Sequence, residues 1–284
     1  MIYFDEIDIG VKPKGAANFT GLLAQSCSLS INNKASEVYS AGRRGVISVS
    51  PNGPAEASLS VSYLLESEAE PCFEVVRLLK NHNPSKTRIS FAGITGDFYL
   101  SKYSFNSNPN QSLSASAQFT CFDLVTGKNA GQFSRHTSSI DYNTTDSITH
   151  GWSTYLVESG THPKAHPTLG LQYSFQARHE PMYVINKQVP SQVDFMAAKE
   201  SVSTIKTELY NAHVSGITGQ KSNLANTGTF SGQLTLAPVL LACRNDKPDA
   251  SLTIDLSGSH IESTNVSANV SDIVRTQIIA NKYF

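Results

Sequence analysis

The chain has 284 residues, of which 16% are charged and 39% aliphatic or aromatic, and its formal net charge is -1. This length suits one large domain or two ordinary ones, and the balanced charge gives no basic excess that would draw the chain onto nucleic acid. The low charge and the many Gly, Pro, Ser, Thr and Asn residues favour an all-β protein over a helical one.

The ends and the cysteines narrow the cellular setting. The acidic start, residues 1–8, lacks the basic region of a signal peptide, and apolar runs such as residues 236–243 are too short to span a bilayer, so no membrane partner is expected. None of the cysteines has the CxxC spacing of a zinc or redox motif, which favours buried thiols in a protein assembled in a reducing cytoplasm. The four are Cys27, Cys72, Cys121 and Cys243.

The first predicted strand carries Cys27, Leu29 and Ile31 at alternate positions, as expected for a strand with one buried face. A hairpin bearing Gly and Arg residues follows it. Its tip residues Arg43 and Arg44 are candidate contacts with a neighbouring subunit or ring, and the alternative is a solvated turn. Further strands are expected over residues 58–65, 91–100, 103–105 and 117–122.

Residues 71–81 have the pattern of a helix. Pro71 fits the first helical position, and Phe73, Val76 and Leu79 form one apolar stripe that should dock on the sheet of the first half. Three carboxylates precede the helix and favour its N-terminus electrostatically, so they need no acid–base chemistry to explain them. These are Glu66, Glu68 and Glu70.

The second half repeats the pattern of the first. Leu29 matches Tyr173 at an offset of 144 (173 − 29), and Leu100 matches Leu256 at an offset of 156 (256 − 100). Identity is scarce, but the alternation is preserved, and alternation decides which side chains face the core. In the second copy a short apolar stretch, residues 239–243, is expected in place of the helix. We therefore predict two tandem antiparallel β-barrel or sandwich modules, over residues 1–127 and 165–284, joined by a linker over residues 128–164.

The stretch between the two copies, roughly residues 127–167, contains a candidate metal set and a candidate catalytic set, and the sequence favours neither. Pro163 and Pro167, each directly after a histidine, exclude the helix on which such ligands would converge, and no Gly-x-Ser-x-Gly motif accompanies the Ser/His/Asp set. No metal, cofactor or catalytic residue is therefore expected, and the linker is expected to hold a short strand near residues 153–157. The two sets are His150, His162 and His166 with Glu158, and His136, Ser138 and Asp141.

The order of elements in the first half, with the segments at residues 41–51, 58–65, 91–105 and 117–122, resembles the tail-tube fold of tailed phages, which is shared with contractile injection system tubes and baseplate hub rings. The resemblance covers residues 20–127 and, through the repeat, residues 165–284. It implies a ring of six modules whose hairpins pair edge to edge, with rings stacked into a conduit through which genomic DNA slides without specific binding.

Two modules in one chain imply a ring of three chains with pseudo-sixfold symmetry, and a six-chain ring is the alternative. The predicted function is a ring protein of a tail tube, located in the virion tail, assembled in the host cytoplasm and in contact with sheath, tube or baseplate proteins. The alternatives are a hub or adaptor ring, and a receptor- or carbohydrate-binding tail module, which the single Trp152 disfavours. An enzyme ranks last because no polar constellation supports one.

Overall fold

A computed structural model gives the fold of the chain, which is mainly antiparallel β, as predicted. It contains one helix among the residues that it describes. Those residues are 9–32, 35–42, 44–51, 56–65, 70–82, 86–108, 114–123, 126–127, 152–158, 165–167, 170–185, 187, 189–207, 229–230, 232–238, 252–255, 258–267 and 275–284.

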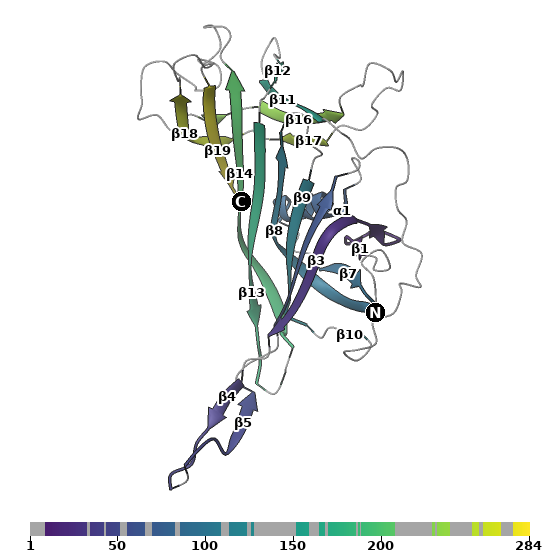
Figure 1. The fold of residues 1–284 in the computed structure, drawn as a ribbon, viewed down its shortest axis with the longest axis vertical. Helices are drawn as coiled ribbons and strands as arrows, with labels where there is room; N and C mark the ends of the chain where they lie inside the picture. Colours follow the sequence, from purple (N-terminus) through teal and green to yellow (C-terminus); the bar gives the residue numbers. More distant parts are fainter. Residues whose placement is uncertain are drawn as a thin grey trace.

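Eight strands form one antiparallel sheet that runs through both halves of the chain, and we call these eight strands the wall (Figure 1). Their spatial order is β3-β6-β9-β8-β13-β14-β19-β18. The halves therefore meet by direct pairing of β8 with β13. The strands are β3 (Leu23–Asn32), β6 (Glu56–Leu64), β8 (Ile94–Ser107), β9 (Ser114–Cys121), β13 (Gly170–Met182), β14 (Gln192–Thr207), β18 (Ser259–Ser267) and β19 (Arg275–Tyr283).

Both halves of the wall have the same strand order: first, second, fourth, third in sequence. In both, the third strand bulges against the fourth, directly after Leu100 in one half and after Ile261 in the other. When the two bulges are aligned, Leu29 and Tyr173 occupy equivalent places in the two halves. Leu100 then corresponds to Ile261, which is five residues beyond the expected Leu256. Leu256 itself lies outside the described residues. The equivalent rows are Leu29–Leu59–Phe119–Leu100 and Tyr173–Val202–Ala280–Ile261.

Shorter strands surround the wall. The start of β8 leaves it to pair with β7 and β10, and β7 continues to β1 and β2. A second sheet has the order β12-β11-β16-β17, and its β11 confirms the strand expected in the linker. The strands are β1 (Ile9–Lys12), β2 (Thr20–Gly21), β4 (Ala35–Val38), β5 (Ser48–Pro51), β7 (Thr87–Phe91), β10 (Thr126–Gly127), β11 (Trp152–Glu158), β12 (Ala165–Pro167), β15 (Thr229–Phe230), β16 (Gly232–Pro238) and β17 (Leu252–Asp255).

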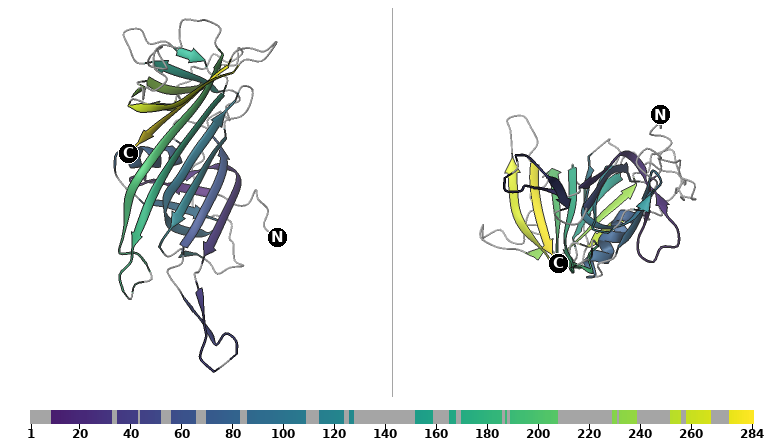
Figure 2. Two further views of the ribbon diagram at one scale, coloured as in Figure 1. Left: turned by 90° about the vertical axis from the view of Figure 1, so that its left-hand side faces the viewer. Right: turned by 90° about the horizontal axis from the view of Figure 1, so that it is seen from below.

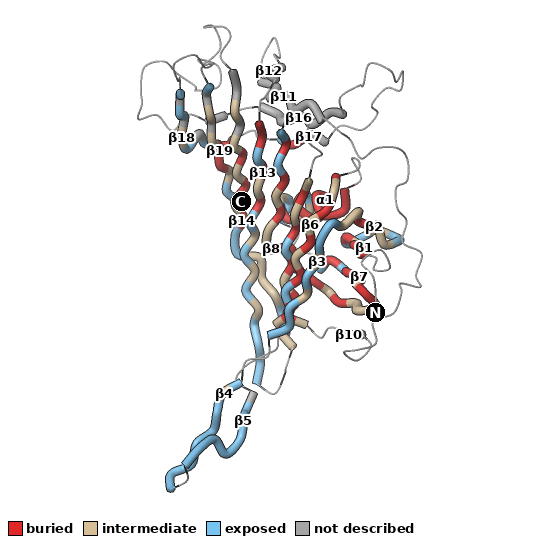
Figure 3. The backbone as a smooth tube through the Cα atoms, viewed as in Figure 1, coloured by how far each residue is buried: buried red, intermediate tan, exposed pale blue. Residues whose placement is uncertain are grey.

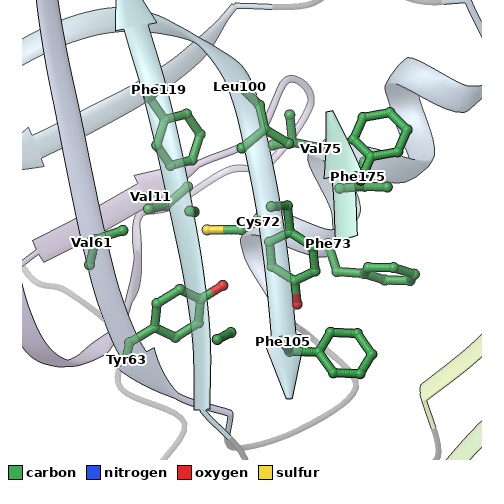
Figure 4. Close-up of a cluster of buried hydrophobic side chains, with 14 of the residues drawn as sticks. Val11, Val61, Tyr63, Cys72, Phe73, Val75, Leu100, Phe105, Phe119 and Phe175 are labelled. Atoms are coloured by element: carbon green, nitrogen blue, oxygen red, sulfur yellow. The ribbon is translucent and has the colours of Figure 1, made fainter. Parts of the chain in front are cut away.

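The predicted helix is confirmed as α1 (Pro71–Lys80), and Phe73, Val76 and Leu79 are all buried. The apolar face of the helix packs among wall and β1 side chains (Figure 4). The ring of Phe73 lies 6.0 Å from that of Tyr103 on β8 and 6.2 Å from that of Tyr173 on β13. The helix therefore packs against strands of both halves, whereas the sequence predicted contact with the first alone.

The far end of α1 holds a buried charge of the second half. Glu200 on β14 is 1% exposed, and it accepts hydrogen bonds from the ammonium of Lys80 and from the hydroxyl of Tyr173 (2.7 Å). Burial lowers the pKa of Lys80, and the nearby Glu200 carboxylate opposes that shift. We call these three residues the clamp, because they tie the helix of one half to a strand of the other.

Candidate functional site

The wall has one apolar face against α1 and one polar face, because buried and exposed residues alternate along its strands (Figure 3). On the polar face, six neighbouring strands place serine in a single row. The Oγ atoms of Ser104 and Ser116 in this row are 2.9 Å apart. The row is Ser26–Ser62–Ser116–Ser104–Ser174–Ser201.

The next row of the polar face has longer side chains than the serine row, and two of them are positively charged lysines. Lys102 and Lys199 lie on either side of Gln176 in this row. The ammonium of Lys199 lies 5.7 Å from the centroid of the Tyr283 ring. The row is Ser28–Ser60–Gln118–Lys102–Gln176–Lys199–Tyr283.

A shallow hollow of about 510 Å³ lies on this row. Its lining includes Lys102, Lys199 and, two residues along β13 from Gln176, Arg178. No acidic residue lines it. The sequence reading missed this polar face, although serine at every second position of three strands (Ser26 to Ser30, Ser58 to Ser62, Ser114 to Ser116) is the signal that could have revealed it.

In the part of the chain that the structure describes, the wall ends in two strand edges that are open along most of their length. Within the described residues, β3 pairs with β6 on one side only, and β18 pairs beyond β19 only through Ser259 and His260 with the two residues of β15. Ile31 on β3 is 53% exposed although its alternation places it on the apolar face. Exposed strand edges are templates for pairing with another chain.

Two hairpins extend from the same end of the wall (Figure 1). One is β4–β5, and the other is the turn between β13 and β14. Their tips expose large apolar side chains, which a monomer in water would ordinarily bury. These side chains are Val38, Tyr39, Val46, Ile47 and Val49 on the first hairpin, and Met182, Tyr183, Val184 and Ile185 on the second.

The predicted contact residue Arg44 lies exposed in the turn between β4 and β5, and its partner Arg43 lies outside the described residues. The turn contains Gly42 and Gly45, both with positive φ, a conformation that glycine adopts without strain. The hairpin expected from the sequence is therefore present. The contact of Arg43 and Arg44 with a neighbouring subunit or ring stays a prediction.

The buried carboxylates serve structure. Glu70 caps α1 by accepting hydrogen bonds from the backbone N–H groups of Cys72 (3.0 Å) and Phe73, and from the hydroxyl of Tyr63. Burial raises the pKa of Glu70, and these hydrogen bonds oppose the rise. The arrangement satisfies two free N–H groups of the first helical turn, as the sequence position of this carboxylate suggested.

The candidate metal and catalytic sets cannot be assembled from the described residues. Of the metal set only Glu158 and His166 have a described backbone, on β11 and β12, and the catalytic set lies wholly outside. The residues that the structure does describe contain no cluster of three or more His, Cys, Asp or Glu able to hold a metal. They also contain no helix long and apolar enough to cross a membrane.

Burial raises the pKa of the Cys27 thiol to about 12.

No family model and no curated protein matches the sequence. Two solved structures are similar to part of the chain. A chain in the tail of an empty gene transfer agent particle, with C6 symmetry, has 12% sequence identity and a TM-score of 0.38, and the match covers 45% of this chain and 99% of that one. A chain in the virion of a native gene transfer agent particle has 12% identity and a TM-score of 0.37, with the same coverage.

Proposed function

We propose that the protein is a non-enzymatic structural subunit of a phage tail, located in the virion, that forms a ring around a channel for DNA. The observation that carries the proposal is the wall: one sheet with a polar face, an apolar face under a helix and, among the described residues, an edge at each end that is open along most of its length. Two such edges on one subunit are what a ring needs, because closure removes every edge.

The junction inside the chain supplies a template for the junction between chains. Inside the chain, the third strand of the first half, β8, pairs antiparallel with the first strand of the second half, β13. In the ring, β18, the third strand of the second half, pairs in the same way with β3 of the next chain. Ser174 lies opposite Ser104 in the internal junction, so the equivalent pair between chains is Ser30 and Asn265.

Three chains close the ring. The wall has eight strands per chain, so three chains supply twenty-four (3 × 8). With a strand spacing of ~4.8 Å and a tilt of ~40°, such a barrel measures roughly 48 Å across between backbones, which leaves room for a DNA duplex. The bend of the wall, seen along the molecule in Figure 2, is in keeping with a curved surface of this kind.

The two halves are, in this proposal, copies of one module over residues 1–127 and 165–284, joined by residues 128–164. The shared strand order and the matching bulges support the duplication. Since each half would contribute the same junction, the ring is threefold in chains and close to sixfold in structure.

The apolar hairpin tips have a role along the channel axis. Both hairpins project from one end of the wall, where a second ring or another tail protein would cover them. Arg44, on the first hairpin, would then lie at that interface.

A hub or adaptor ring is the second candidate, and one observation favours it. The sheet β12-β11-β16-β17 is separate from the wall, and no second copy of it is present in the described residues. In Figure 1 it lies at the end opposite the β4–β5 hairpin. A ring with two different ends suits the place where a tube meets a different component.

The mass of the assembled particle, with electron microscopy of the same sample, tests the proposal. We expect rings of three chains with six similar lobes around a channel. A six-chain ring would mean that one half lines the channel and the other decorates the outside. Monomers that stay monomeric at high concentration would overturn the proposal altogether.

A further inference from the structure

We infer that the hollow on the polar face is a site that contacts the phosphates of duplex DNA through Lys102, Arg178 and Lys199, and we call this site the station. The inference rests on the proposed ring, with the polar face turned toward the channel and the apolar face, which α1 covers, turned away from it. The proposed function requires only an open channel, whereas this inference identifies the residues that contact the DNA inside it.

The three cations are set at a spacing suited to a polyanion. Lys102 and Lys199 stand two strands apart in one row, about 10 Å at a strand spacing of ~4.8 Å. Arg178 is two residues along β13 from Gln176 of that row, roughly 7 Å away at the rise of an antiparallel strand. Neighbouring phosphates of a DNA strand are separated by comparable distances, so one chain can reach two or three of them.

The cations are available to a ligand. None of the three forms an ion pair with another described residue, and the hollow that they line contains no acid. The amides of Gln118 and Gln176 line the same hollow and add neutral hydrogen-bond donors.

The surroundings favour a polymer that slides over one that stays bound. The serine row beside the hollow offers short hydroxyls without bulky side chains. The one aromatic side chain in the lining, Tyr283, lies at the edge of the hollow beside Lys199. Glu180 and Asp194 face each other two residues beyond Arg178, toward the hairpin tip, and limit the extent of the positive field. A few phosphate contacts per chain, bounded by acids, give weak attachment that depends strongly on salt.

Fluorescence anisotropy of a short labelled DNA duplex, titrated with the purified protein at several salt concentrations, tests the inference. The variant Lys102→Gln/Arg178→Gln/Lys199→Gln should lose at least about tenfold in affinity at low salt, and the slope of log affinity against log salt should fall by about 2 to 3. Each single substitution should lower that slope by about 1. Two duplexes of different sequence should bind alike, because phosphate contacts do not read bases.

The matched control is Lys14→Gln/Arg77→Gln/Arg88→Gln, which removes the same charge from residues off the polar face. It should keep the affinity and slope of the wild type, and thermal melting verifies that both triple variants are folded. Wild-type affinity in the first variant, or an equal loss in the control, would overturn the station. Rings that assemble without that DNA contact would leave the proposed function standing. If the wild type forms no ring but the triple variant still binds DNA more weakly than the wild type, the three cations remain a DNA contact and the proposed function is overturned.

Discussion

The two halves of the wall share their strand order but not the way in which their apolar face is covered. The first half brings its own helix, and its equivalent row is wholly large and apolar, Leu29–Leu59–Phe119–Leu100. The second half has Tyr173–Val202–Ala280–Ile261 and contains no helix in the described residues.

Glu200 makes the contrast sharper. By the same alignment its counterpart in the first half is Ala57, and both are buried. The second half thus buries a carboxylate where the first buries a methyl group, and it depends on Lys80 of the first half's helix to compensate the charge. The one described helix therefore contacts both halves, through the ring of Phe73 and through the Lys80–Glu200 ion pair.

The largest expected effect comes from breaking the helix contact. Val76 is fully buried, so Val76→Asp places a charge without a partner in the core and should abolish soluble expression or assembly. The control on the same helix is Arg77→Ala, which removes an exposed ion pair with Glu74 and should change stability by less than about 1 kcal/mol. A normal yield of assembled Val76→Asp particles would show that α1 does not hold the halves together.

The next largest expected effect comes from substitutions in the clamp. Lys80→Met leaves the Glu200 carboxylate buried without its cation, and the free energy of unfolding in urea should fall by about 3–5 kcal/mol. The double variant Lys80→Met/Glu200→Ala, which gives the second half the alanine of the first, should recover a large part of that loss. If the double variant is as unstable as the sum of the two single variants, the pair is not coupled across the halves.

A smaller effect distinguishes the second half by pH. His179 on β13 packs against the rings of Tyr99 (5.2 Å) and Phe195 (5.8 Å), and burial lowers its pKa to about 4. The unfolded chain takes up a proton near the ordinary histidine pKa of 6.5 while the folded chain does not. Stability should therefore fall as the pH drops from about 6.5 to 4, by at most roughly 3 kcal/mol. His179→Phe should flatten this part of the stability curve, and an unchanged curve would assign the dependence to other groups.

The sequence predicted the elements better than their connections. Alternation in the strand with Cys27, Leu29 and Ile31, and the apolar stripe of residues 71–81, are local patterns that decide local structure, and both elements are present. With the equivalent bulges aligned, Leu100 matches Ile261 at an offset of 161 (261 − 100), where the sequence pattern predicted 156. The difference lies in the longer connection between the second and third strands of the second half, whose length leaves no mark on the alternation of the strands.

The sequence did not predict the sheet that both halves share, nor the clamp. Pairing of β8 with β13 and the contact of Lys80 with Glu200 join residues of different halves, and nothing near either residue in the sequence marks its partner. The polar face was readable in principle, because serine recurs at every second position. Its alignment into one row across six strands depends on register, which the sequence does not display.

The most direct test of the ring is a disulfide between neighbouring chains in the proposed register. In the double variant Ser30→Cys/Asn265→Cys the two thiols face each other across the β3–β18 junction, at a Cα separation of about 4.5–5.5 Å that suits a disulfide. Mild oxidation should give covalent dimers and then a closed product of three chains on a non-reducing gel. The register-shifted variant Ser30→Cys/Ser267→Cys and the wild type should give neither. A closed product of six chains, or equal cross-linking in the shifted register, would contradict the account that the internal junction is repeated between chains.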